Sequence, residues 1–182
     1  MSKKLNVKDM VYSALFATLT AVLSFVTIPL PFSPIPITGQ SLAVMLAGCV
    51  LTPIQAGFSM LTFLFMGAIG LPVFSGGRSG IGVIVGKSGG YLIGYLIGAI
   101  IISIIVSKSK SKISMFLACL FGGIIVVHAL GAAWLGYVTG MGIGKAIMVG
   151  SVPFLPGDML KSVVAVIIAA RLNKEMIRYA RA

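Results

Sequence analysis

Charged side chains are scarce in this sequence: they make up 9% of its 182 residues, against 58% hydrophobic residues. An ordinary soluble domain carries roughly 25% charged residues. A water-soluble fold of this composition would have too little polar side chain to cover its surface, so a soluble domain is excluded. The scarcity of charge predicts one compact membrane domain over residues 1–182, with no soluble part large enough to fold alone.

Groups that usually perform catalysis are also few. His128 is the single histidine, and it lies within an apolar run, where we interpret it as a helix-packing or hydrogen-bonding residue. No G-x-S-x-G motif surrounds a serine, and an intramembrane aspartyl protease would need two aspartates where only Asp158 lies at depth. Cys49 and Cys119 lack metal-ligand spacing and are interpreted as buried thiols. The sequence therefore predicts no enzyme, no cofactor and no metal site.

Motifs of a self-sufficient pump or a pore are missing as well. The sequence has no Walker motif, so any ATP-driven process must use a separate ATPase. A channel needs rings of polar groups, which a single polar pair would supply only in an oligomer.

The charges that are present are mostly positive: 14 Lys and Arg against 3 Asp and Glu give a net charge of +11. A basic protein can bind nucleic acid, but these cations sit in short clusters between apolar runs, such as Lys108, Lys110 and Lys112. Such clusters are typical of topology signals and of contacts with anionic lipid. Membrane lipid, and not nucleic acid, is therefore a predicted partner.

Apolar runs predict a bundle of six transmembrane helices in an all-α membrane protein. The first run follows Lys3, Lys4 and Lys8, as in a signal peptide, but no A-x-A-like cleavage site follows it, so we expect a retained helix. Four prolines from Pro29 to Pro36 then predict a non-helical loop. The predicted spans are Met10–Ile28, two within Ile37–Ile69, Gly90–Val106, Ile113–Tyr137 and Gly157–Leu172.

The run Ile37–Ile69 is interrupted at Pro53, and it could form one long span or two short ones of ~16 residues. The positive clusters decide between these alternatives. Lys8 before the first span and Lys108 after Gly90–Val106 both mark cytoplasmic segments, and an even number of crossings must separate them. Two short helices satisfy this count, which places both termini in the cytoplasm and the Gly-rich loops outside.

Small residues recur at four-residue spacing on two of the predicted helices. The two stripes are Ser13, Ala17 and Ala21 on the first helix, and Gly90, Gly94 and Gly98 on the fourth. In lipid, small residues let helix backbones approach closely, which is a main source of helix association. The glycine stripe favours packing inside the bundle, whereas for the first-helix stripe docking of a partner protein competes with that explanation. The sequence leaves self-association open.

Asp158 and Lys161 form a charged pair within the last span. A charge deep in a membrane costs about 2.5–3.5 kcal/mol on insertion scales, and three-residue spacing places both side chains on one helix face, where they can neutralise each other. In one interpretation Asp158 caps the helix after Pro156, and Lys161 extends its ammonium group outward. In the other, the pair forms a polar binding site, to which Arg78 and Lys87 add cations for an anionic ligand.

Three segments of the sequence carry a resemblance to one family. Pro34–Leu42 reads PIPITGQSL, Gly70–Gly80 reads GLPVFSGGRSG, and Lys87–Tyr95 reads KSGGYLIGY. Together with Gly157–Lys161, which reads GDMLK, they resemble BioY, the biotin-specific S component of energy-coupling factor (ECF) transporters, over nearly the whole chain. Lys87 departs from the family pattern, which more often has proline in a G-P-[ST]-G-G run.

The resemblance implies a fold, a substrate and partners. It implies six helices in the cell membrane of a prokaryote, with the proline-rich loop as a lid over an outward-facing site. Biotin would be captured there with high affinity and delivered to the cytoplasm. A transmembrane coupling protein and two ATPase subunits would be the partners, and Ala17 and Ala21 would match the A-x-x-x-A docking motif of the family's first helix.

The resemblance also implies which residues bind the substrate. On the family pattern these are Asp158, Lys161, Gln40, Arg78 and Tyr91. The ureido ring of biotin has two N–H donors and a carbonyl acceptor, which the carboxylate of Asp158 and the ammonium of Lys161 complement as a pair. The carboxylate of biotin needs a cation, for which Arg78 or Lys87 is available.

Overall fold

The computed structural model describes residues 6–179 of the chain, and side chains as far as Glu175. Lys3 and Lys4, which contribute to the predicted topology, lie outside the described residues. The helices are α1 (Val7–Leu23), α2 (Gln40–Val50), α3 (Pro53–Ala68), α4 (Ile81–Val85), α5 (Gly89–Lys108), α6 (Lys112–Ala118), α7 (Val127–Thr139), α8 (Ile143–Gly150) and α9 (Leu155–Tyr179). The shorter elements are strands β1 (Thr27–Ile28) and β2 (Ile37–Thr38), the 3₁₀ turns η1 (Ser75–Gly77) and η3 (Val152–Phe154), and the π-helical stretch η2 (Cys119–Val126).

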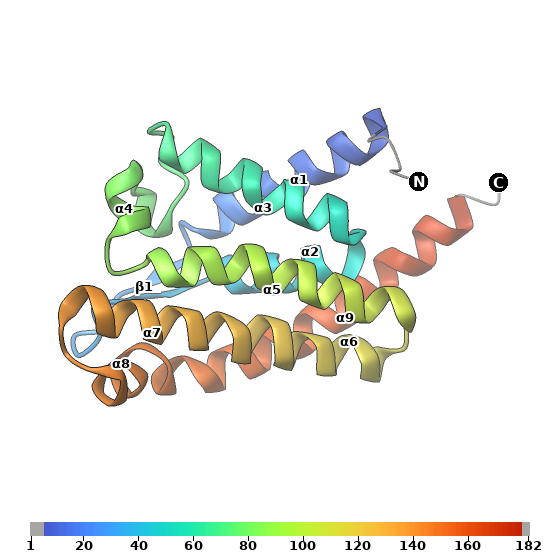
Figure 1. Ribbon diagram of the computed structural model, residues 1–182. Coiled ribbons are helices and arrows are strands. Elements are labelled where there is room, and N and C mark those ends of the chain that lie inside the picture. Colours follow the sequence, from blue (N-terminus) through green and yellow to red (C-terminus); the bar gives the residue numbers. More distant parts are fainter. Residues whose placement is uncertain (1–5, 180–182) are drawn as a thin grey trace.

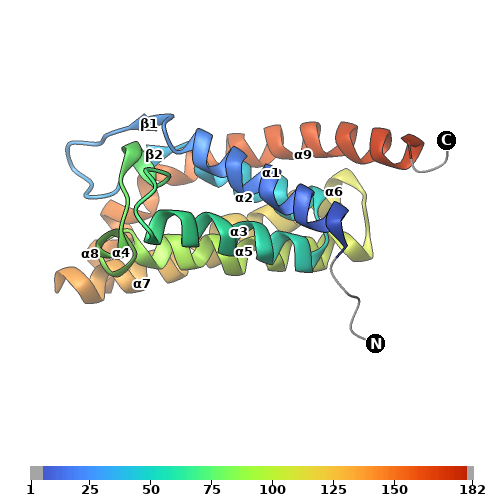
Figure 2. The same cartoon turned by 90° about the horizontal axis from the view of Figure 1, so that it is seen from above.

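The long helices lie along one common direction (Figures 1 and 2), and η2 joins α6 to α7 in one continuous rod. At one end of the bundle lie β1, α4 and α8; at the other, α1 begins and α9 ends. We call these the cavity end and the packed end. The two Gly-rich segments that were predicted as loops contain the short helices α4 and α8.

Three helical stretches are long and apolar enough to cross a membrane: Gly89–Lys108, Lys112–Thr139 and Ile143–Glu175. Helices α2 and α3 are shorter apolar helices. Large apolar side chains such as Phe58, Phe121 and Ile167 are exposed on the outside of the bundle, as contact with lipid requires. The predicted all-α membrane fold is confirmed, while the number of crossings and the side of each terminus stay predictions.

The break between α2 and α3 arises from the local sequence. The Thr52 side chain accepts a hydrogen bond from the Gln55 backbone N–H, and Gln55 Oε1 accepts one from the Thr52 N–H at 2.9 Å, which together form a capping box. Pro53 occupies the first helical position, where a missing N–H costs no hydrogen bond. The predicted division of Ile37–Ile69 into two helices is therefore correct, but α2 has 11 residues and is shorter than predicted. That both helices cross the membrane stays a prediction.

Helix α1 ends at Leu23, five residues before the predicted end of the first span. The chain instead forms β1, which pairs antiparallel with β2 in a short hairpin. The backbone N–H of Gly39 donates to the Val26 carbonyl at 2.9 Å and extends this pairing to the start of α2. The proline-rich segment forms the tip of this hairpin and is non-helical, as predicted. The hairpin thereby fixes where α2 begins.

The glycine stripe of α5 packs inside the bundle, as the sequence favoured. A Cβ atom at Gly98 would lie 2.5 Å from the Gly122 carbonyl oxygen, and one at Gly90 would collide with Trp134. These contacts join α5 to η2 and α7. Only glycine allows so close an approach, because any side chain would force the two helices apart.

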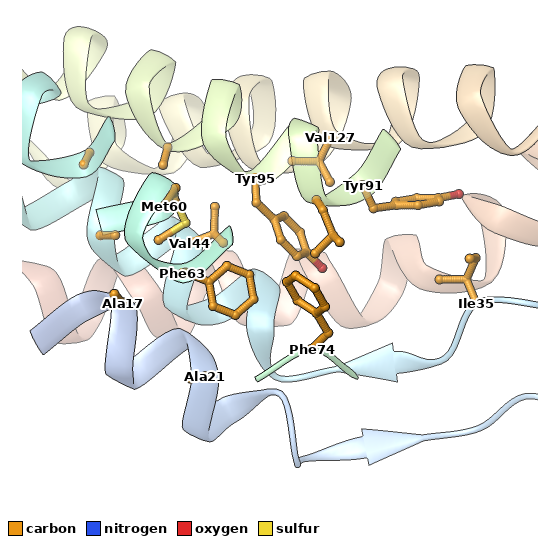
Figure 3. Close-up of a cluster of buried hydrophobic side chains, with 14 of the residues drawn as sticks. Ala17, Ala21, Ile35, Val44, Met60, Phe63, Phe74, Tyr91, Tyr95 and Val127 are labelled. Carbon is orange, nitrogen blue, oxygen red and sulfur yellow. The ribbon is translucent and has the colours of Figure 1, made fainter. Parts of the chain in front are cut away.

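The stripe on α1 also faces inward, and this corrects the docking prediction. Ala17 is fully buried, Ala21 is 8% exposed, and Ser13 Oγ donates to the Gln55 carbonyl of α3 at 3.0 Å. Figure 3 shows Ala17 on the side of α1 that faces the core. Ala17 and Ala21 are therefore not a docking face, because buried side chains cannot meet a partner helix. The exposed side of α1 carries Ala14 instead.

The packed end contains a core that joins α2, α5, η2 and α9. Cys49 and Cys119 are both buried there, as predicted, with their sulfur atoms 3.4 Å apart. Nothing in the sequence indicated this proximity, since the two residues are 70 positions apart.

Candidate binding site

A cavity at the cavity end lies where distant segments of the chain meet. It holds about 590 Å³ of space between atoms, counting its open mouth. The proline-rich hairpin, the start of α2, the η1 and α4 segments, and α5, α7 and α9 all contribute to its wall. Its polar lining residues are Thr38, Gln40, Ser41, Ser75, Arg78, Ser88, Tyr91, Tyr95, His128, Asp158 and Lys161.

Asp158 lies in the first turn of α9, and its carboxylate joins three helices. Its Oδ1 accepts hydrogen bonds from Ser41 Oγ of α2 and from Lys161 Nζ, each at 2.9 Å, and its Oδ2 lies 2.9 Å from His128 Nε2 of α7. These partners are side chains that meet at the cavity. The structure therefore rules against the helix-cap interpretation of Asp158.

Lys161 points into the bundle and not outward. Its ammonium group donates to the Thr38 carbonyl at 2.8 Å and to Ser41 Oγ and Asp158 Oδ1, each at 2.9 Å. The side chains of Lys161 and Asp158 are only 20% and 7% exposed. A buried ion pair is tolerated when its remaining hydrogen-bonding groups are satisfied, and the backbone of β2 and the hydroxyl of α2 do this here.

Of the remaining residues predicted for the site, the structure brings three to the cavity and leaves one outside. Gln40 is 2% exposed, and its Nε2 has no partner within the described residues. Tyr91 is buried and donates its hydroxyl to the Gly150 carbonyl at 2.6 Å. Arg78 is exposed at the mouth, where its guanidinium donates to the Ser75 carbonyl. Lys87 is exposed and does not line the cavity.

Aromatic and aliphatic side chains form the rest of the wall. Figure 3 shows Tyr95 of α5 and Phe74 of the η1 segment pointing toward one another, with Ile35 of the proline-rich loop further along. Phe74 packs against Phe63 of α3, edge to face, with 5.5 Å between the ring centroids. The cavity thus combines an apolar wall with a few converging polar groups, as small-molecule sites commonly do.

Sequence reasoning missed six polar residues of the cavity wall, and three of these, Thr38, Ser41 and His128, contact Asp158 or Lys161 directly. Ser41 and Thr38 flank the predicted Gln40 but carry no charge that would single them out. His128 did offer a signal, because an ionisable residue inside an apolar helix marks a functional site by default. The described residues contain no group of three or more His, Cys, Asp or Glu side chains that could hold a metal ion.

Comparisons with known proteins agree on one family. The BioY family profile matches residues 1–178. Over 173 residues the chain is 40% identical to the biotin transporter BioY of Rhizobium etli, covering 90% of this chain and 92% of that one. It is 35% identical over 175 residues to the probable biotin transporter BioY of Bacillus subtilis, covering 94% of both chains.

A solved structure matches the fold as well. It is the S-component for biotin from an ECF-type ABC transporter, with a TM-score of 0.87, 32% sequence identity, and coverage of 94% of this chain and 95% of that one. With its apolar helices, this chain is a multi-pass protein of a prokaryotic plasma membrane, and it is not an enzyme. The chain belongs to the BioY family.

Proposed function

We propose that this chain binds biotin in the cavity between the hairpin, α5, α7 and α9, and carries it across the membrane as the substrate-specific subunit of an ATP-driven ECF transporter. The observation that carries the proposal is the buried Asp158–Lys161 pair in the wall of a cavity that combines apolar and polar side chains. Relatives named biotin transporters and the matching S-component for biotin support the choice of substrate.

The polar pair suits the ureido ring of biotin. Asp158 accepts from a ring N–H group, and Lys161 donates toward the ring carbonyl in place of one of its present hydrogen bonds to Thr38 or Ser41. In a site closed to water each such hydrogen bond counts strongly, because an unpaired buried donor or acceptor costs about 1–3 kcal/mol. The thioether ring and the pentanoate chain pack on the apolar wall, which includes Phe74, Tyr95 and Val127.

Cations at the mouth suit the other end of the molecule. Arg78 lies at the rim of the cavity, and we assign it to the carboxylate of biotin. Gln40 and Tyr91 line the space between the two ends. Lys87 is exposed and does not line the cavity, so we assign it only to the positive potential around the entrance.

Transport needs further subunits, because the chain has no motif for ATP hydrolysis. We propose a transmembrane coupling protein and two ATPase subunits as partners. The mouth of the cavity opens at the outer face of the membrane in this proposal, and the proline-rich hairpin forms its lid. Biotin is captured with high affinity from outside and is then released to the cytoplasm.

Equilibrium binding of labelled biotin to the detergent-purified protein tests the proposal. Saturable binding, competed by unlabelled biotin and more weakly by its methyl ester, is the expected result. Absence of saturable binding by a folded sample would refute biotin as the ligand. Uptake by vesicles that contain this chain with and without the ATPase module then tests the transport step, which should require ATP.

A further inference from the structure

The hydrogen bonds around Asp158 and Lys161 leave few free positions for a ligand. A carboxylate offers about four acceptor positions and an ammonium group three donors. Asp158 already accepts from Ser41 and Lys161 at Oδ1 and contacts His128 at Oδ2, while Lys161 uses its three donors on Thr38, Ser41 and Asp158. Asp158 can therefore accept one more hydrogen bond, whereas a cyclic urea presents two N–H groups.

His128 can supply the second acceptor. A carboxylate is an acceptor only, so the 2.9 Å contact with Asp158 Oδ2 requires a hydrogen on His128 Nε2. In the neutral imidazole the other nitrogen, Nδ1, is then an acceptor. His128 Nδ1 is buried and has no hydrogen-bond partner within the described residues, although His128 lines the cavity.

The surroundings hold the imidazole ring in place. Tyr91 of α5 meets it edge to face, with ring centroids 6.0 Å apart and an interplanar angle of 82°, and Phe154 lies 6.1 Å away on the side of α9. His128 is the second residue after the π-helical stretch η2, and π-helical turns occur often at functional sites.

Resting on the proposed biotin site, we propose that His128 is a specificity-determining residue: its neutral ring accepts one ureido N–H at Nδ1, while Asp158 Oδ2 accepts the other. The free Nε2 donor of the buried Gln40 is available for the ureido carbonyl. The site thus recognises a ligand with two N–H donors on either side of one carbonyl group.

The chain offers an unusually direct test, because His128 is its single histidine. Histidine labelled with ¹⁵N, in protein purified with a tag that contains no histidine, gives signals from this one ring. We expect the Nδ1 signal of an unprotonated nitrogen that shifts when biotin saturates the site. With the two biotins that carry a methyl group on one or the other ureido nitrogen, one of the two should fail to produce this shift.

Two variants separate recognition from a purely structural role. His128→Gln can place its amide N–H at the position of Nε2 and keep the bond to Asp158, but it lacks the Nδ1 acceptor. His128→Asn can place its amide oxygen at the position of Nδ1 and loses the bond to Asp158. We expect His128→Gln to weaken biotin binding by about tenfold or more, which is about 1.4 kcal/mol. Its affinity for one mono-N-methyl biotin should match that of the wild-type protein.

The outcomes distinguish this inference from the proposed function. Wild-type protein that binds no biotin refutes both. Wild-type protein that binds biotin without any change at Nδ1 refutes the role of His128 alone. Equal losses of affinity for biotin and for both methylated analogues in His128→Gln also refute it, because a residue that only positions Asp158 would produce that result. A smaller loss in His128→Asn than in His128→Gln supports the role.

Discussion

The two ends of this molecule differ in whether their buried polar groups have hydrogen-bond partners. At the packed end, Asn173 Nδ2 donates to the Cys49 carbonyl and Ser103 Oγ to the Leu51 carbonyl, which pairs groups left free where α2 ends. Five buried side-chain atoms lack a partner in the part of the chain that is described, Ser59 Oγ and Ser151 Oγ among them, and the other three are Gln40 Nε2, Ser75 Oγ and His128 Nδ1 at the cavity end. All three residues line the same cavity.

This contrast explains how one small bundle provides both rigidity and recognition. Backbones at the packed end approach so closely that Gly48 and Gly122 have no room for a Cβ atom beside Ile102. Close packing supplies stability in lipid, where burial of apolar surface gives no driving force between helices. The cavity end is held by the hairpin and by polar contacts around Asp158, which leaves hydrogen-bonding groups for a ligand.

The largest effect is expected from breaking the charged pair at the cavity end. Asp158→Asn and Lys161→Met should each weaken biotin binding by about 30-fold or more, because removing one partner of a buried charged pair costs about 2–5 kcal/mol. Equilibrium binding to detergent-purified variants measures this. Their insertion and their elution as folded protein should match the wild type, and unchanged affinity in both variants would remove the pair from the site.

A smaller effect is expected from breaking the packed end. Gly98→Ala should lower the free energy of unfolding by about 3 kcal/mol, the upper limit of what overpacking typically costs. The reason is that its Cβ would lie 2.5 Å from the Gly122 carbonyl oxygen. The matched control is Gly144→Ala on α8, where a Cβ would meet no atom within 4 Å. Thermal unfolding in detergent should separate the two variants, and equal midpoints would show that the close approach is not needed.

Helix α1 provides a comparison within one element. Ala17→Leu should destabilise the bundle by about 1 kcal/mol or more, because Ala17 is fully buried and a larger side chain would overpack its surroundings. Ala14→Leu, on the exposed side, should leave the unfolding midpoint unchanged. The midpoint of thermal unfolding and the affinity for biotin should both fall in Ala17→Leu. If this variant were as stable as Ala14→Leu, the inward placement of the stripe would be wrong.

The smallest effect is expected at the mouth of the cavity. Arg78→Gln should reduce the affinity for biotin by up to about fivefold, because an exposed charge pair contributes about 0.2–1 kcal/mol. Lys87→Gln, outside the cavity, should change it less. The effect of Arg78→Gln should vanish with biotin methyl ester in competition binding, since this ligand has no carboxylate. An undiminished effect with the ester would assign Arg78 a different role.

The sequence predicted those features that depend on local patterns. Apolar runs identified the long helices, and Pro53 marked the division between α2 and α3. The pairing of β1 with β2 could not be foreseen, because it joins strands of two residues each across a proline-rich tip. The direction of the α1 stripe was also ambiguous, since four-residue spacing serves packing and docking equally well.

The site was predictable only in part, for a related reason. Asp158 and Lys161 lie three residues apart on one helix. Charged residues within an apolar span need an explanation, which drew attention to this pair. His128 lies 30 residues from Asp158 and Ser41 lies 117 residues from it, so only the folded bundle reveals these contacts. The predicted role of Lys87 rested on its charge alone, and charge does not indicate which way a loop directs its side chains.

The most direct measurement of the central claim is an experimental structure of the protein with biotin bound. We expect the ureido ring within hydrogen-bonding distance of Asp158 and Lys161, the fused rings against Phe74 and Tyr95, and the carboxylate toward Arg78. Biotin found elsewhere, for example in the apolar groove that Met10, Ala14 and Phe58 line between α1 and α3, with the Asp158 cavity empty, would contradict it.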